Sequence, residues 1–141
     1  MFDSLLEKKF YDTYILPKYK SGEITDYVLQ KKYELQSSFK HNGDTIRPID
    51  YVSDFWYMEN GKEYVKDIKG GLIDSVAKIK RKLMYAKYPT VDFEWITHTI
   101  ETGWINWDKY EKIKRDKKKK SKVISESSQK LRIVNQCMIG K

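Results

Sequence analysis

The sequence predicts an α+β fold in which a mixed sheet carries helices on both faces. Two Asn-Gly pairs, Asn42–Gly43 and Asn60–Gly61, each lie between runs of β-branched and aromatic residues, a pattern typical of hairpins with type I′ turns. After Gly70–Gly71 the apolar spacing changes to that of a helix, and after Pro89 it returns to the alternation of a strand. The hairpins predict an antiparallel meander. The later pattern predicts a crossover helix that leads to a parallel strand.

A helix is expected near the amino terminus. Ser4 and Glu7 have the S-x-x-E spacing of a capping box, which satisfies free backbone N–H groups at a helix start. We expect Pro17 to end or kink this helix, because proline donates no backbone hydrogen bond, and residues 18–26 to form a loop. The apolar face of the helix would consist of Leu6, Phe10 and Tyr14.

Residues 27–41 are interpreted as an extended run that leads into the first hairpin. With Asn42–Gly43 as the turn, Phe39 lies opposite Ile46. Pro48 then interrupts the pairing, as proline does at sheet edges and bulges. We expect these strands to form a meander that ends in the second hairpin.

The second hairpin, within residues 51–71, fixes a register. With Asn60–Gly61 as a two-residue turn, Asp54 faces Asp67 across the ladder. Directly opposed residues have Cβ atoms about 4.5–5.5 Å apart, and Lys69 emerges on the same face because side chains alternate along a strand. The sequence therefore predicts that two carboxylates and a lysine converge.

Residues 72–86 have the spacing of a helix that ends before Pro89. On a face away from its apolar stripe lie Lys78, Arg81 and Lys82, which either grip a phosphate backbone or form an ordinary solvated face. The strand at residues 91–97 is expected to run parallel to residues 63–69, with a right-handed connection. The predicted apolar stripe consists of Leu72, Val76, Ile79, Leu83 and Ala86.

Residues 103–110 are predicted to begin a short helix near Asn106 or Trp107.

The basic charge lies at the carboxyl end of the chain. Residues 1–112 contain 18 basic and 18 acidic side chains, whereas residues 113–141 contain 10 and 2, which is the entire net charge of +8. We predict a domain at 1–112 and a basic tail at 113–141 that is either disordered or binds nucleic acid through phosphates. The densest basic run in the tail is Lys117, Lys118, Lys119 and Lys120.

The cysteine content predicts a reducing compartment. The chain has one cysteine, Cys137, so neither an internal disulfide nor a C-x-x-C zinc pattern is possible. The sequence shows no signal peptide, and no run approaches the ~18 apolar residues of a membrane-spanning helix. We therefore expect a cytoplasmic protein that does not bind a membrane.

The converging acids predict a metal site. Two carboxylates that face each other repel, and one is pushed toward its neutral form unless a positive charge lies between them. Mg²⁺ or Mn²⁺ fits this place, because such ions bind one or two carboxylates together with water and phosphate oxygens. Phosphodiester hydrolysis is the reaction class that this suggests. The alternative is a solvent-facing polar stripe in which Lys69 simply neutralises Asp54 and Asp67.

These residues resemble the PD-(D/E)XK nuclease superfamily, and more closely a group of small phage-encoded members related to Holliday junction resolvases. Ser53 and Asp54 stand in the place of the Pro-Asp pair. The sequence Asp67-Ile68-Lys69, followed by two glycines, stands in the place of the (D/E)XK strand end. The resemblance extends more weakly over residues 4–98. Ser53 departs from the pattern, but it replaces a backbone feature and removes no metal ligand.

The resemblance implies a restriction-endonuclease-like core and a metal-dependent DNA endonuclease that acts on branched DNA, such as Holliday junctions in phage recombination. Asp54 and Asp67 would bind Mg²⁺ or Mn²⁺, and Lys69 would assist the attacking water. Glu7 would orient the metal or the water, although its place in the capping box explains it equally well. A homodimer is expected because symmetric cutting of two strands needs two sites, and a phage-encoded protein would act in the host cytoplasm.

Two other functions remain open from the sequence. One is a non-catalytic nucleic-acid-binding or adaptor protein on a nuclease-like fold, because fold alone does not imply activity. The other is a basic protein-interaction module without a nucleic acid. His98, at the end of the predicted parallel strand, is a candidate base or ligand, or neither.

Overall fold

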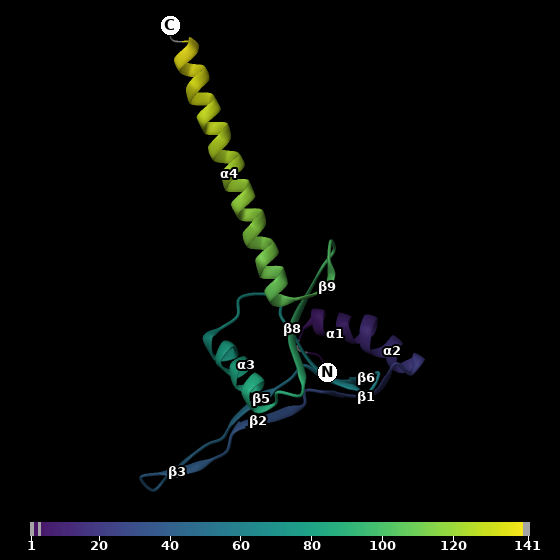
Figure 1. Cartoon of the computed structure of the whole chain (residues 1–141). Coiled ribbons are helices and arrows are strands. Elements are labelled where there is room, and N and C mark those ends of the chain that lie inside the picture. Colours follow the sequence, from purple (N-terminus) through teal and green to yellow (C-terminus); the bar gives the residue numbers. More distant parts are fainter. Residues whose placement is uncertain (1, 3, 140–141) are drawn as a thin grey trace. The chain divides into compact units, whose positions relative to one another are not determined.

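The computed structural model describes residue 2 and residues 4–139, with side chains as far as residue 130. The chain divides into two compact units, Met1–Trp107 and Asp108–Lys141. Helix α4 spans Trp107–Ile139, so its start is as predicted, but the prediction of a short helix is wrong, because it has 33 residues. The described part of the second unit consists of this helix (Figure 1). The predicted tail boundary after residue 112 falls inside α4, and the last two residues of that tail lie outside the described part.

The described residues of the first unit form a mixed five-stranded sheet in the order β1-β6-β7-β8-β9. Neighbouring strands are antiparallel except β7 and β8, which are parallel and are connected through helix α3. This confirms the predicted fold class, an α+β fold with a crossover helix that is consistent with a restriction-endonuclease-like core. The elements are β1 (Ile24–Leu29), β6 (Phe55–Glu59), β7 (Lys62–Ile68), α3 (Ser75–Lys87), β8 (Asp92–Thr99) and β9 (Gly103–Asn106).

The hairpin of β6 and β7 has the predicted register. Phe55 pairs with Lys66 and Glu59 pairs with Lys62, and the turn residues Asn60 and Gly61 have φ angles of 49° and 79°. Both values lie in the left-handed region that a type I′ turn requires. Asp54, directly before β6, therefore lies at the level of Asp67 in β7.

Residues 32–52 leave the sheet and form a separate ribbon, which we call the β-arm. It contains β2 (Lys32–Gln36) paired with β5 (Ile49–Val52), and β3 (Phe39–His41) paired with β4 (Asp44–Ile46). The predicted pairing of Phe39 with Ile46 is confirmed. In Figure 1 the β-arm extends away from the sheet.

The prediction of one extended run at residues 27–41 is wrong. The run is divided among β1, β2 and β3, because the chain turns at Gln30, whose φ angle is 55°. As a result β1 pairs directly with β6, and the β-arm is inserted between these two neighbours.

The amino-terminal helix begins as predicted but does not end at Pro17. The Ser4 hydroxyl accepts a hydrogen bond from the Glu7 N–H at 3.1 Å. A π-helical turn precedes the proline, which then lies in the first turn of the next α-helix, where a missing N–H is tolerated. The loop predicted at residues 18–26 is accordingly only two residues long, 22–23. The three helical segments are α1 (Leu5–Phe10), η1 (Tyr11–Ile15) and α2 (Leu16–Ser21).

The prediction of the buried face of α3 is wrong. Val76 and Ile79 are 56% and 58% exposed, whereas Met84 is fully buried. The guanidinium carbon of Arg81 lies 3.9 Å from the centre of the buried Trp95 ring in β8, a favourable cation–π contact. The face of α3 that carries Arg81 therefore packs on the aromatic side chains of the sheet. The apolar stripe predicted from the sequence remains largely exposed to solvent.

The sheet is covered on both faces, as predicted. The amino-terminal helices pack on one face, where Phe10 meets Phe55 edge to face with ring centres 4.9 Å apart. On the other face, Tyr85 of α3 packs edge to face against Phe93 of β8, with ring centres 5.7 Å apart. No helix in the described part of the chain has both the length and the apolar composition needed to cross a membrane.

Ser53, at the junction of β5 and β6, makes two hydrogen bonds that a proline at this position would lose. Its side chain is fully buried, and its N–H and its hydroxyl both donate to the carbonyl oxygen of Lys31, at 2.9 and 3.0 Å. Proline could make neither hydrogen bond. These bonds hold the base of the β-arm beside the start of β6.

We expect Ser53→Pro to destabilise the protein more than Ser53→Ala does. Alanine keeps the N–H bond and loses about 1 kcal/mol of unfolding free energy, whereas proline also leaves the Lys31 carbonyl without its donors, for a further ~1–3 kcal/mol. Urea denaturation of both variants measures the difference. Equal stability of the two variants would contradict this role of the Ser53 N–H.

Candidate functional site

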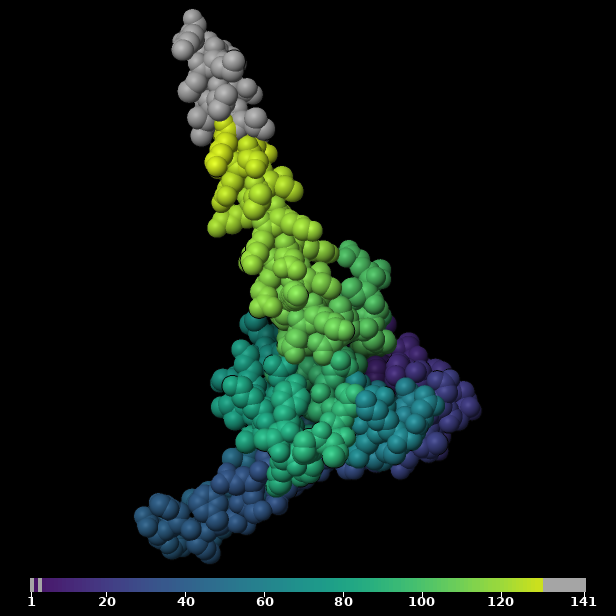
Figure 2. All heavy atoms as spheres, viewed as in Figure 1, coloured from purple at the N-terminus to yellow at the C-terminus, as the bar shows by residue number. Residues whose placement is uncertain are grey.

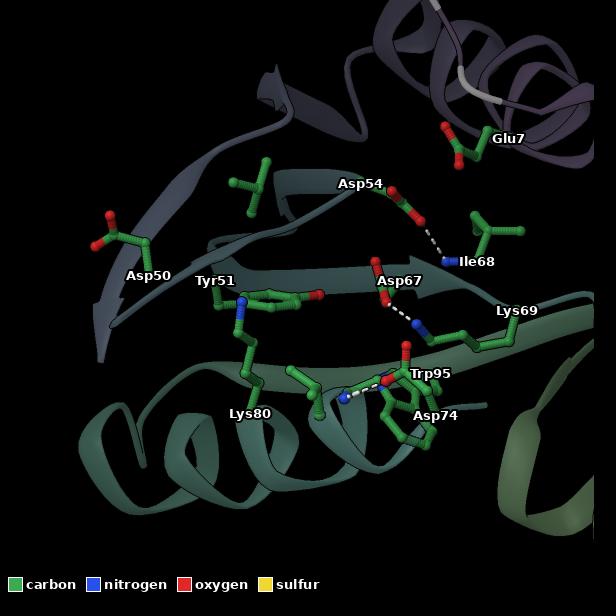
Figure 3. A pocket seen from close by; sticks show the side chains of 13 residues that line it. Glu7, Asp50, Tyr51, Asp54, Asp67, Ile68, Lys69, Asp74, Lys80 and Trp95 are labelled. Carbon is green, nitrogen blue, oxygen red and sulfur yellow. Dashed lines mark hydrogen bonds and ion pairs between the residues drawn. The ribbon is translucent and has the colours of Figure 1, made fainter. Parts of the chain in front are cut away.

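An open pocket of about 450 Å³ lies at the carboxyl end of β7. Figure 3 shows side chains from five parts of the first unit that reach it: α1, the β-arm, the β6–β7 hairpin, α3 and β8. The titratable residues that line it are Glu7, Asp50, Tyr51, Asp54, Asp67, Lys69, Asp74 and Lys80. The pocket therefore contains the two predicted carboxylates and the predicted lysine.

The hairpin positions Asp54 and Asp67 at the centre of the pocket. Asp67 is 5% exposed, and its Oδ2 atom lies 2.6 Å from Nζ of Lys69. Oδ2 of Asp54 accepts a hydrogen bond from the N–H of Ile68 at 2.8 Å. The N–H of Lys69 donates to the Ile96 carbonyl in β8 at 2.8 Å, so the parallel strand fixes the backbone of the lysine.

The two carboxylates disturb each other electrostatically. Burial, and then the charge of Asp67, raise the pKa of Asp54 from its ordinary 3.8 to about 8. The charge of Glu7 contributes in the same direction, and the hydrogen bond from the Ile68 N–H opposes it. With every carboxylate ionised, the site would carry more negative charge than Lys69 alone offsets, and without a cation Asp54 holds a proton instead.

Glu7 lies both in the capping box and at the pocket. Its backbone N–H is capped by Ser4, while its side chain, buried at 9% exposure, lines the pocket. In Figure 3 it reaches toward Asp54 from α1. The capping box therefore sets the position from which the Glu7 carboxylate faces the site.

The donor set fits a hard divalent cation only as a partial ligand shell. Within residues 2 and 4–139, no group of three or more His, Cys, Asp or Glu side chains is arranged to hold a metal ion. Asp54 and Asp67 offer carboxylate oxygens, and their mutual repulsion is the feature that a cation would relieve. Mg²⁺ commonly accepts such a pair, with water and phosphate oxygens completing its shell.

The basic residues predicted on α3 occupy different surroundings. Lys78 and Lys82 are exposed, whereas Arg81 stacks on Trp95. Lys80, which the sequence analysis missed, extends from α3 into the pocket (Figure 3). Its sequence signal is its spacing from the helix start: it follows the N-cap residue Asp74, which also lines the pocket, by six positions.

Tyr51 was missed as a site residue as well. It lies in β5, three residues before Asp54, and its side chain is 8% exposed at the edge of the pocket. No sequence pattern distinguishes it from the other tyrosines. Only the docking of the β-arm against the sheet brings it to the carboxylates.

His98 does not line the pocket. Its Nδ1 atom lies 3.2 Å from Nζ of Lys9, and its ring packs edge to face against Trp104 with centres 4.8 Å apart. Burial and the charge of Lys9 lower its pKa. These contacts account for His98 without a role in the site.

The predicted basic run lies on α4 in the second unit. All four side chains are exposed, and Figure 2 colours this part of α4 yellow-green. Consecutive residues of an α-helix are about 100° apart, so four consecutive lysines surround the helix with positive charge. The run is Lys117, Lys118, Lys119 and Lys120.

Comparison with known protein families gives a match over most of the chain. A family model described as "Protein of unknown function (DUF1064)" matches residues 1–103. No curated protein matches the chain. The matched segment includes Glu7, Tyr51, Asp54, Asp67 and Lys69.

The raised pKa of Asp54 predicts a pH-dependent stability. Between pH of about 4 and about 8 the folded protein holds a proton on Asp54 that the unfolded chain releases, so the unfolding free energy of the metal-free protein falls as the pH rises through this window. Asp54→Asn removes this contribution. Urea denaturation at pH 5 and pH 8 should show a larger decrease for the wild type than for Asp54→Asn, with the exposed Asp26→Asn as control. Equal decreases would contradict the raised pKa.

Proposed function

The chain belongs to the DUF1064 family, and because that family is described only as one of unknown function, we propose an activity from the residues of this chain: metal-dependent hydrolysis of phosphodiester bonds in DNA. The observation that carries the proposal is the convergence of Asp54, Asp67 and Lys69 in an open pocket at the end of β7. An adaptor has no need of a buried, mutually repelling pair of carboxylates. A hydrolase that binds a cation between them does.

In this proposal Asp54 and Asp67 would hold a divalent cation. Such an ion would supply a water of lowered pKa and would neutralise charge on the phosphoryl group. Lys69, placed 2.6 Å from Asp67, orients the attacking water and stabilises the negative charge that develops at phosphorus. Glu7 accepts a hydrogen bond from that water on the opposite side of the pocket from Lys80.

Binding of the DNA backbone is assigned to the basic residues around the site. Lys80 contacts the phosphate in the pocket, and Lys78 and Lys82 contact neighbouring phosphates from the exposed side of α3. Arg81 acts indirectly, since its stacking on Trp95 holds α3 against the sheet. The lysines of α4 add affinity that does not depend on sequence.

Branched DNA is the substrate class that we propose, with Holliday junctions in phage recombination as the leading case. This assignment rests on the resemblance of Ser53–Asp54 and Asp67–Lys69 to small phage resolvases. Such cleavage would need a homodimer, because two strands are cut at symmetric positions.

The first experiment is cleavage of labelled single strands, duplexes, flaps, forks and four-way junctions in Mg²⁺ or Mn²⁺. Asp67→Asn and Lys69→Ala are each expected to lower kcat at least about 100-fold, because each removes a charge that acts at the phosphate. Lys62→Ala is the matched control. This lysine lies at the other end of β7 and pairs with Asp92 at 3.0 Å, far along the strand from the pocket.

The outcomes separate the two classes of function. Metal-dependent cleavage that is lost in both site variants and kept in Lys62→Ala supports the nuclease. If the wild type binds these DNAs but cuts none of them with either metal, the carboxylates are structural and the protein is a binding or adaptor protein.

Lys80→Ala should weaken the use of DNA without removing cleavage. Loss of one phosphate contact is expected to lower kcat/KM about tenfold and to reduce the slope of log affinity against log salt by about 0.9. The control is Lys87→Ala, an exposed lysine on the same helix that does not line the pocket. Equal salt slopes for Lys80→Ala and the wild type would show that Lys80 contacts no phosphate.

A further inference from the structure

Two buried tyrosines of the β-arm have hydroxyls with no hydrogen-bond partner among the described residues: Tyr33 and Tyr51. They are directly opposed in the β2–β5 ribbon and are 6% and 8% exposed. A buried hydroxyl without a partner destabilises a fold, so each such group calls for an explanation.

The two hydroxyls differ in what lies in front of them. Tyr33 packs edge to face against Tyr88, with ring centres 4.9 Å apart, and is not part of the pocket lining. Tyr51 lines the pocket, and in Figure 3 its hydroxyl points toward Asp67. Tyr51 is therefore the candidate for a functional role, and Tyr33, in the same ribbon but outside the pocket, is the matched control.

The Tyr51 hydroxyl has the chemistry to donate to Asp67. A phenol hydroxyl carries one O–H donor, whereas an ionised carboxylate only accepts hydrogen bonds. Asp67 already receives Nζ of Lys69 on its Oδ2 atom, at 2.6 Å. A second donor on the opposite side of this carboxylate would fix its orientation.

We propose that Tyr51 is a positioning residue whose hydroxyl donates a hydrogen bond to the Asp67 carboxylate when that carboxylate binds a divalent cation. The inference rests on the proposed metal-dependent function and adds an outer partner to its ligand set. Carboxylates that bind metal are themselves held by hydrogen bonds, and loss of such a partner commonly lowers metal affinity or activity 10–100-fold. In this arrangement the Tyr51 hydroxyl gains its hydrogen-bond partner when the cation binds. Strand β5 of the β-arm is then part of the site.

The test compares Tyr51→Phe with Tyr33→Phe in the full-length chain. Each change removes one unpartnered buried hydroxyl and keeps the ring, so both variants should unfold, without metal, at or above the wild-type melting temperature. Mn²⁺ binding is measured by calorimetry in the absence of DNA. We expect the Kd for Mn²⁺ to rise about tenfold or more in Tyr51→Phe and to stay at the wild-type value in Tyr33→Phe. In cleavage assays Tyr51→Phe should lower kcat and leave the KM for DNA unchanged.

The possible failures are distinguishable. If the wild type cleaves DNA and Tyr51→Phe binds Mn²⁺ and cleaves like the wild type, the role of Tyr51 is wrong and the nuclease proposal stands. If Tyr51→Phe and Tyr33→Phe weaken Mn²⁺ binding equally, the effect belongs to the ribbon and the role of Tyr51 is again wrong. If the wild type binds no Mn²⁺ and cuts no DNA, both proposals are wrong.

Discussion

The repulsion between Asp54 and Asp67 is the constraint on which the site depends. The Asn60–Gly61 turn fixes the pairing of β6 with β7, and that pairing brings both carboxylates to the same end of the hairpin. Neither acid can move away without a change of register, which would turn every side chain of a strand to the other face. The charge is instead offset locally, by Lys69 on Asp67 and by the Ile68 N–H on Asp54. What remains uncompensated is suited to a cation.

The pocket is completed by elements that are unrelated in sequence but meet at the end of β7. α1 contributes Glu7, the β-arm contributes Tyr51 and α3 contributes Lys80. Each element is anchored by contacts outside the pocket: the Ser4 cap for α1, the bonds of Ser53 to Lys31 for the β-arm, and the stacking of Arg81 on Trp95 for α3. Groups that destabilise the fold when alone, namely a crowded carboxylate pair and a hydroxyl without a partner, are therefore held in place by contacts elsewhere. Such local conflicts are most common at functional sites.

Predictions from sequence succeeded where a local signal was sufficient. Asn-Gly turns require positive φ angles at two adjacent residues, and this requirement defined both hairpins and their registers. The prediction of the buried face of α3 was wrong. Hydrophobicity alone predicts that Val76 and Ile79 face the sheet, but Arg81 faces it instead, because its guanidinium stacks on the ring of Trp95. The prediction that residues 27–41 form one extended run was also wrong. Nothing in the residue pattern around Gln30 reveals that the chain leaves the sheet there.

The sequence by itself determined the convergence of Asp54, Asp67 and Lys69, because a two-residue turn and the two-residue period of a strand are local geometry. It also determined the concentration of positive charge beyond residue 112. Only the tertiary structure decided that Glu7, Tyr51 and Lys80 share one pocket with these residues. Their positions follow from how α1, the β-arm and α3 dock on the sheet. Docking depends on packing between segments far apart in the chain, and no local pattern records it.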